Sequence, residues 1–238
     1  MQREMEGSDP DSQIVAPEGM SVVVEHPVIF KMPRLQNDKE REEVILGCLY
    51  ELKGKFPDLI TLSTGRLLKE IDGCTHAIFV RFPSRKALID YYTSEQLMEV
   101  IQKMLPSLSG EYTVDYSGFA FNDLVKEHEN SVVHITFWKF ADEITSEAVE
   151  DVMSSLYSLK NEMPSIVLQI SAGSNNYLRD KAFSHAFVAR LASENTVEGF
   201  YSHPAYVKIM EEKIQPHCKR ILSADFTPYS PPLAGPRL

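Results

Sequence analysis

The chain has 238 residues, 43% of them hydrophobic, which is enough to bury the core of one large domain or two smaller ones. Its formal net charge is −10, and no segment gathers the Lys and Arg side chains that a nucleic-acid surface requires, so we expect no nucleic acid as a partner. The sequence contains no apolar run long enough to cross a bilayer, and the acidic first residues lack the pattern of a signal or transit peptide.

The first half of the chain predicts strands and helices in the order βαββαβ. β-Branched and aromatic stretches bounded by turn residues predict strands, and apolar residues at helical spacing predict helices. The expected strands are residues 21–32, 58–68, 75–82 and 110–121, and the expected helical segments are 38–56, 84–92 and 94–105.

The second half repeats this order at an offset close to 108 residues. "HPVIFK" at His26 returns as "HITFWK" at His134, "STG" at Ser63 returns as "SAG" at Ser171, and "THAIFVRF" returns as "SHAFVARL". A repeat of this kind indicates a duplicated domain. Strands are expected at 131–140, 165–173, 183–191 and 218–226, and helical segments at 145–163 and 193–214.

Strand periodicity indicates how the two copies meet. On residues 76–82 both faces are largely apolar, and helices can cover only one of them. The fold class is therefore α+β: two tandem ferredoxin-like βαββαβ domains whose antiparallel sheets pack into one α/β barrel. The expected division is a flexible segment at 1–20, a first domain at 21–121, a linker at 122–130, a second domain at 131–227 and a Pro-rich tail at 228–238.

Three motifs resemble the plant stress-responsive A/B barrel domain family, whose members form dimeric α/β barrels. They are "VVHITFWKFADEIT", "FSHAFVARLAS" and "FYSHPAYVKIMEEKIQP", and the first copy keeps "EHPVIFK" and "CTHAIFVRFPS". The resemblance implies that this chain builds, from its own two domains, the barrel that single-domain relatives build by dimerising. Further oligomerisation stays open.

One branch of that family is similar to olivetolic acid cyclase, which uses a His/Tyr acid-base pair. The resemblance places the catalytic tyrosine at Tyr91 in the first copy and at Phe200 in the second, and the catalytic histidine at Leu97 and Tyr206. Neither copy keeps the pair, and a tyrosine with a pKa near 10 is a poor general base. We therefore do not transfer the cyclase mechanism, and no residue is assigned as catalytic.

The remaining polar residues are interpreted in two ways. In the functional interpretation, the two strand histidines of each copy lie near each other at one end of the sheet, with His76 and His185 facing a shared interior, and they form small pockets. In the structural interpretation they are hydrogen-bonded scaffold residues, His203 begins a helix, and Tyr206 belongs to the core. The pocket candidates are His26, His76, Tyr91, His134, His185, His203 and Tyr206.

No cofactor is required by the sequence, and no metal-binding motif of usual spacing occurs in it. The family resemblance adds a magnesium ion held by backbone carbonyls at the end of the first helix of each copy. The positions are Leu49, Leu52 and Lys55 in the first copy and Tyr157, Lys160 and Met163 in the second.

These observations favour a non-catalytic barrel, or one that binds a small hydrophobic ligand. The alternatives are a cyclase-like or monooxygenase-like enzyme that uses pocket His and Tyr residues, and a protein-interaction module with an acidic surface. The last three residues, Pro236, Arg237 and Leu238, have the small-basic-leucine form of a peroxisomal address. The expected location is the peroxisome, with the cytoplasm as the alternative.

Overall fold

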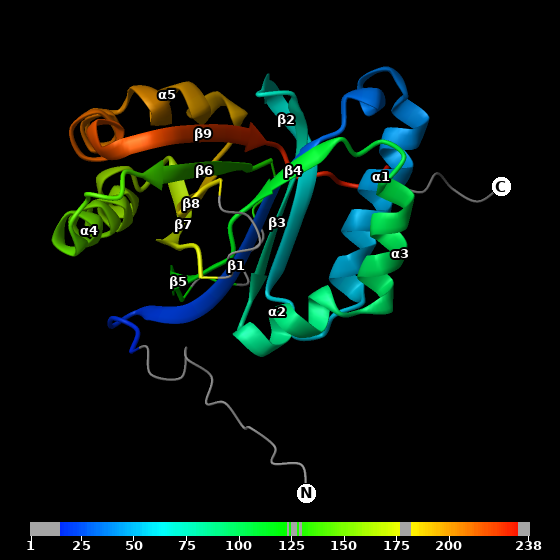
Figure 1. Ribbon diagram of the computed structural model, residues 1–238, viewed down its shortest axis with the longest axis horizontal. Coiled ribbons are helices and arrows are strands. Elements are labelled where there is room, and N and C mark those ends of the chain that lie inside the picture. The colour runs from blue at the N-terminus through cyan, green and yellow to red at the C-terminus, as the bar shows by residue number, and fades with distance from the viewer. Residues whose placement is uncertain (1–14, 123, 125–127, 129, 177–181, 233–238) are drawn as a thin grey trace, which may run out of the picture.

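Two similar halves make up the computed structural model, which describes residues 15–122, 124, 128, 130–176 and 182–232 (Figure 1). In the first half the elements are β1 (Met20–Lys31), α1 (Lys39–Glu51), β2 (Thr61–Ile71), β3 (Cys74–Phe82), α2 (Arg85–Tyr92), α3 (Glu95–Met104), β4 (Gly110–Thr113) and β5 (Tyr116–Phe121). In the second half they are β6 (Val132–Phe140), α4 (Ser146–Glu162), β7 (Val167–Ser174), β8 (His185–Leu191), α5 (Val197–Ser202), α6 (Pro204–Lys208) and β9 (Cys218–Phe226).

Some of the predicted segments lie outside the described residues. These are the start of the N-terminal segment, residues 123, 125–127 and 129 of the expected linker, and the terminal tripeptide at 236–238. Among the residues that the structure does describe, no helix is both long and apolar enough to span a membrane.

The predicted fold class is confirmed. Each half has the ferredoxin-like strand order. In the first half β4 and β5 both pair with β1, and the sheet continues through β3 to β2. In the second half the strand order is β9-β6-β8-β7. Strand β2 pairs with β9 and thereby joins the two sheets. At the opposite seam β5 lies against β7, so the joined sheet curls into a barrel.

Side chains divide into three layers because the pleat sends alternate residues to opposite faces. Ile29, Phe79, Ile135 and Phe137 point into the barrel and pack together between the two sheets. The other face of the first sheet packs against α1, α2 and α3, and that of the second sheet against α4, α5 and α6. Figure 1 shows the two groups of helices on opposite sides of the molecule.

Polar residues fix where the helices begin. The side chains of Asp38, Ser84, Ser94 and Thr145 each accept a hydrogen bond from a backbone N–H of the first turn that follows, in α1, α2, α3 and α4 respectively. These N–H groups have no partner within a helix, so the caps satisfy them.

Two details differ from the expected elements. The polar segment expected to connect the second and third strands is mostly strand, and the chain turns at Asp72 and Gly73, which both have positive φ. The last strand of the first copy is interrupted at Val114 and Asp115, whereas β9 runs without a break through Asp225. The pairing register with β1 is the same on both sides of this interruption, and the Asp115 carboxylate lies against His26 of β1.

Different contacts hold the two seams of the barrel. At the β5–β7 seam the Tyr157 hydroxyl, reaching over from α4, lies 2.9–3.1 Å from the backbone N–H and C=O groups of Phe119 and Ala172. The strands approach closely at Gly173, where an added Cβ would lie 2.8 Å from the carbonyl oxygen of Ser117. At the β2–β9 seam the chain after β9 continues the pairing, and the Tyr229 N–H donates to the Thr64 carbonyl at 2.6 Å.

Candidate functional site

A histidine, an aspartate and a tyrosine come together in the second half. His134 on β6 lies directly opposite Asp225 on β9, and its Nδ1 is 2.9 Å from Oδ1 of the carboxylate. Helix α5 places Tyr201 above them, so that its hydroxyl donates to Oδ2 of Asp225 at 2.7 Å and lies 3.3 Å from Nδ1 of His134. The imidazole and the phenol hydroxyl therefore both contact the Asp225 carboxylate.

The first half contains the same cluster. Nδ1 of His26 on β1 is 2.6 Å from Oδ1 of Asp115, and the Tyr92 hydroxyl at the end of α2 donates to Oδ2 of Asp115 at 2.6 Å. The Tyr92 hydroxyl is also 2.9 Å from Nδ1 of His26. The cluster therefore belongs to the repeated unit and not to one half alone.

The second cluster extends further than the first. Thr136 Oγ1 is 2.8 Å from Nε2 of His134 and 2.9 Å from Oγ of Ser223. Nδ1 of His134 has Asp225 as its partner and Nε2 has Thr136, so both ring nitrogens are satisfied. His134 is 0% exposed, so solvent cannot supply another partner. The imidazole thus connects Ser223 to Tyr201 through an unbroken series of hydrogen bonds.

A cavity of about 380 Å³ lies beside this second cluster. Its polar groups include Tyr201, Ser223 and Asp225, and Lys69 and Glu70 at the end of β2 also contribute. The apolar wall is made by Leu68, Ile71, Val197 and Ala224. Since Leu68 and Ile71 belong to the first half, the cavity is complete only when the two halves are joined.

The protonation states follow from burial and neighbouring charge. Burial alone would raise the pKa of Asp225, but the charge and hydrogen bond of His134, together with the Tyr201 hydroxyl, leave that pKa below its usual value. Burial, and then the charge of Asp225, raise the pKa of Tyr201 well above its usual value. At neutral pH the cavity therefore presents a carboxylate and a protonated phenol.

The predicted histidine pairs do not form. His26 lies opposite Val80, and His76 lies opposite Phe30, so the two imidazoles are at different ends of the β1–β3 pair. In the second half Ala189 faces His134 and Trp138 faces His185. An antiparallel partner runs in the reverse direction, so early positions on two such strands lie at opposite ends. The expectation of histidines close together was wrong.

The prediction that His76 and His185 face a shared interior was also wrong. Both lie on the sheet face that packs against the helices, in the same alternation as Ile78 and Phe187. His76 Nε2 is 2.7 Å from Oε1 of Glu42, and the His185 ring stacks on Trp138 at 5.7 Å between centroids. The residues that alternate with them along β3 and β8, such as Phe79 and Val188, point into the barrel.

The other pocket candidates surround the clusters. Tyr91 and Phe200 occupy equivalent buried positions against His26 and His134, and Tyr206 is 4% exposed with its ring centroid 6.0 Å from that of His134. Burial raises the pKa of both Tyr91 and Tyr206. His203 is the N-cap of α6, where its Nδ1 accepts from the Ala205 N–H at 3.3 Å.

Two of the carbonyls proposed as magnesium ligands accept backbone hydrogen bonds at the ends of the first helices. In the second copy the Met163 carbonyl accepts from the N–H groups of Ile166 and Val167, at 3.0 and 2.8 Å, and magnesium at this helix end stays a prediction. In the first copy the Leu52 carbonyl accepts from the Lys55 N–H at 3.0 Å, and magnesium there stays a prediction. Within the described residues no group of three His, Cys, Asp or Glu side chains is arranged to hold a metal ion.

Sequence reasoning missed Tyr92, Asp115, Tyr201 and Asp225. The signal was present in the repeat: Tyr92 and Tyr201 are 109 positions apart, and Asp115 and Asp225 are 110 apart, close to the offset of the histidines. Both aspartates lie in stretches that alternate polar and apolar residues as a strand does, so nothing in the pattern distinguished them from solvent-facing strand residues.

A family model described as Stress responsive A/B Barrel Domain matches this chain twice, at residues 24–117 and 132–228. Among curated proteins, a stress-response A/B barrel domain-containing protein of Arabidopsis thaliana is 23% identical over 226 residues. That alignment covers 93% of this chain and 81% of the relative.

Solved structures extend the likeness to bacterial proteins. A candidate monooxygenase of Fusobacterium nucleatum has a TM-score of 0.66 and 10% identity, and one of Lactobacillus acidophilus has a TM-score of 0.59 and 9% identity. Each alignment covers 87% of this chain and 93% of the other chain. At such low identity the likeness concerns the fold alone.

Proposed function

The chain belongs to the stress-responsive A/B barrel domain family, and from this premise we propose that it binds a small, mainly apolar molecule in the cavity beside Tyr201 and Asp225. The observation that carries the proposal is the composition of the cavity. An apolar wall surrounds a few convergent polar groups, which is the usual form of a small-molecule site, and about 380 Å³ lies within the usual range of volume.

The polar groups indicate what the ligand carries. Ionised Asp225 accepts hydrogen bonds, and the Tyr201 hydroxyl, which donates its proton to Asp225, can accept one from a ligand. A ligand with a hydroxyl group, such as a phenol, can donate to the carboxylate while its apolar body contacts Leu68 and Val197. A purely apolar ligand would leave the carboxylate desolvated without a new partner, which is costly.

Binding explains the geometry better than catalysis does. A general base must reach the proton it removes, but both nitrogens of His134 already have partners within the protein. The enzyme alternative has in its favour the series of hydrogen bonds from Ser223 to Tyr201, in which Tyr201 would be the proton donor. Since the raised pKa of Tyr201 opposes release of that proton, we favour the binding function.

Titration with 2-naphthol, a fluorescent phenol, tests the proposal. Tyr201→Phe and Tyr92→Phe remove the same hydroxyl from the two copies, so each is the control for the other. We expect Tyr201→Phe to weaken binding about fivefold, the effect of one hydrogen bond between neutral groups, and Tyr92→Phe to change affinity less than about twofold.

Filling the cavity gives a second measurement that does not depend on the hydroxyl. Val197→Trp should abolish 2-naphthol binding while the unfolding transition stays cooperative, because Val197 lies at the cavity wall and is only partly buried. Equal affinity in wild type, Tyr201→Phe and Val197→Trp would show that the ligand does not occupy this cavity.

A further inference from the structure

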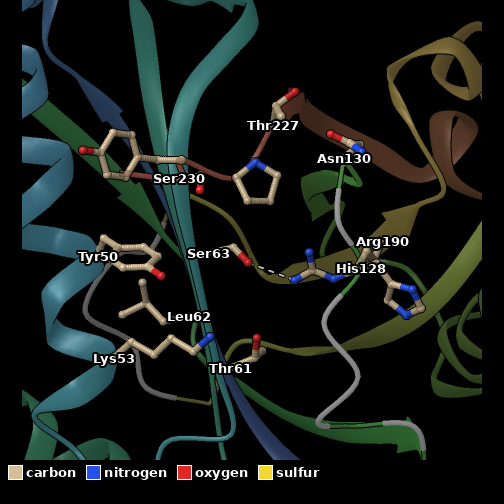
Figure 2. Close-up of a pocket in the computed structure, with 12 residues that line it drawn as sticks. Tyr50, Lys53, Thr61, Leu62, Ser63, His128, Asn130, Arg190, Thr227 and Ser230 are labelled. Atoms are coloured by element: carbon tan, nitrogen blue, oxygen red, sulfur yellow. Dashed lines mark hydrogen bonds between the residues drawn. The ribbon is translucent and has the colours of Figure 1, made fainter. Parts of the chain in front are cut away.

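A second cavity of about 380 Å³ lies where β2 of the first half meets β8 of the second half and the chain that follows β9. It shares no lining residue with the cavity beside Tyr201. Figure 2 shows Lys53 and Arg190 extending into it from opposite sides, with Thr61 and Ser63 between them. Two cationic side chains therefore converge on one space.

Arg190 is a buried cation, with 8% of its surface exposed. Its two terminal nitrogens donate to the hydroxyl oxygens of Ser131 and Ser63, both at 2.9 Å. Burial, and then the positive charge of Arg81, lower the pKa of Arg190 to about 10. The guanidinium is therefore still charged at neutral pH, and its hydroxyl partners satisfy N–H groups without supplying negative charge.

The equivalent arginine of the first copy is held differently. Arg81 lies opposite Glu25 on the neighbouring strand, and its Nη2 is 2.8 Å from Oε1 of that carboxylate. At the matching position opposite Arg190 the second copy has Val133. The barrel interior thus holds two arginines and one carboxylate from these four positions. Buried charges in proteins are normally paired, so a positive charge is left to be balanced.

Lys53 brings a second positive charge to the cavity. It lies in the turn after α1 and contributes to the cavity wall from the first half. Burial, and then the positive charge of Arg190, lower the pKa of Lys53. Two cations that repel each other across a cavity are stabilised by an anion placed between them, and hydrogen bonds between ions are about twice as strong as those between neutral groups.

We propose that this cavity binds a small organic anion whose carboxylate or phosphate group lies between Arg190 and Lys53. Thr61 and Ser63 supply neutral hydroxyl groups beside the charged ones, and the rings of Tyr50 and Tyr229, 6.0 Å apart in an edge-to-face arrangement, form an aromatic wall for the rest of the molecule. The anion supplies to Arg190 the negative charge that Glu25 supplies to Arg81 in the first copy. This site is separate from the proposed site for an apolar ligand.

Isothermal titration of the full chain with two probes tests the proposal, at an ionic strength matched with sodium chloride. Inorganic phosphate represents the phosphate head group, and benzoate represents an aromatic carboxylate. We expect at least one probe to bind with a Kd of about 1 mM or lower. The probe that binds more tightly identifies the head group.

Three variants locate the binding. Arg190→Gln and Lys53→Gln should each weaken the better probe about tenfold, the loss expected for one charge-assisted hydrogen bond. Lys213→Gln is the matched control, because Lys213 pairs with Asp151 away from the cavity. The affinity of this variant for the better probe should stay within about twofold of that of the wild type. Lys53 lies in a partly exposed turn, so Lys53→Gln is informative even if Arg190→Gln fails to fold.

Two results would overturn the proposal. One is that neither probe gives heat beyond that of sodium chloride with the wild-type chain. The other is that Lys53→Gln binds the better probe as tightly as the wild type does.

Discussion

The two His-Asp-Tyr clusters have the same three side chains in the same arrangement, but their surroundings differ. In the second copy Thr136 and Ser223 continue the hydrogen bonds of His134, whereas in the first copy Val28 stands where Thr136 stands in the second. The side chain of Asp225 is 13% exposed beside a cavity, while that of Asp115 is 1% exposed. The shared triad therefore holds β-strand and helix together in both halves, and in the second copy a cavity lies beside it.

Removing each carboxylate tests this difference with the largest expected effect. Asp115→Ala leaves a buried imidazole and a tyrosine hydroxyl without their partner, and we expect it to lower the free energy of unfolding by about 3–5 kcal/mol. Asp225→Ala should cost less, roughly 1–3 kcal/mol, because water in the adjacent cavity can replace part of the carboxylate.

Urea unfolding followed by circular dichroism measures both values. Asp142→Ala is the control, since its side chain is 82% exposed, and we expect a change within about 0.5 kcal/mol. If Asp225→Ala costs as much as Asp115→Ala, the second cluster is as closed to water as the first.

The two strand histidines His76 and His185 differ in their response to pH. Burial lowers the pKa of His185 to about 4, so the unfolded chain takes up a proton at a higher pH than the folded protein does. Stability from this residue is therefore complete above the unfolded pKa of about 6.5 and falls by about 1.4 kcal/mol per pH unit down to pH ~4. Burial also lowers the pKa of His76, but Glu42 opposes the shift, so its contribution should be smaller.

Unfolding free energies measured between pH 7 and pH 4 provide the test. His185→Phe keeps a ring against Trp138 and should remove most of the slope that His185 causes, and His76→Phe should flatten the curve less. A wild-type slope that His185→Phe leaves unchanged would contradict the assignment.

A smaller effect is expected from exchanging the residues that distinguish the clusters. Thr136→Val removes the hydroxyl partner of Nε2 of His134 and should cost about 1–2 kcal/mol. Val28→Thr places a hydroxyl at the equivalent position beside His26 and should cost less than about 1 kcal/mol, because the new group gains an acceptor.

Urea unfolding of the two variants in parallel measures the change in the free energy of unfolding that each substitution causes. The comparison between the copies fails if Val28→Thr destabilises the protein as much as Thr136→Val does.

The repeat in the sequence was sufficient for the architecture. The recurrence of His26 as His134 and of Ser63 as Ser171 predicted two domains of one kind, and apolar residues on both faces of 76–82 predicted that the sheets pack together. The strand direction was not used for the histidines, and so His26 and His76 were placed at the same end. Antiparallel pairing fixes their separation once the strand order is known.

The site was less accessible from the sequence than the fold. Asp115 and Asp225 reach the histidines because each lies opposite its histidine on the neighbouring antiparallel strand, and the sequence alone does not give that pairing register. The cavity beside Asp225 depends on the end of β2, which is distant in sequence and approaches only after the halves join. The repeat aligns Val133 with Glu25, so the sequence shows that no carboxylate lies opposite Arg190. The unbalanced charge becomes evident only once the structure shows that Arg190 is buried.

The Tyr157 hydroxyl at the β5–β7 seam has a consequence for how this barrel changes by mutation. The equivalent residue of the first copy is Tyr50, at the offset that relates the N-caps Asp38 and Thr145. At the opposite seam its ring contacts that of Tyr229, and backbone near Tyr229 completes the pairing. In a dimer of identical chains the two seams would be related by symmetry, and every substitution would appear in both. Here each seam, and each cluster, can change alone. The chain is in effect a heterodimer whose subunits are always equal in number and cannot exchange partners.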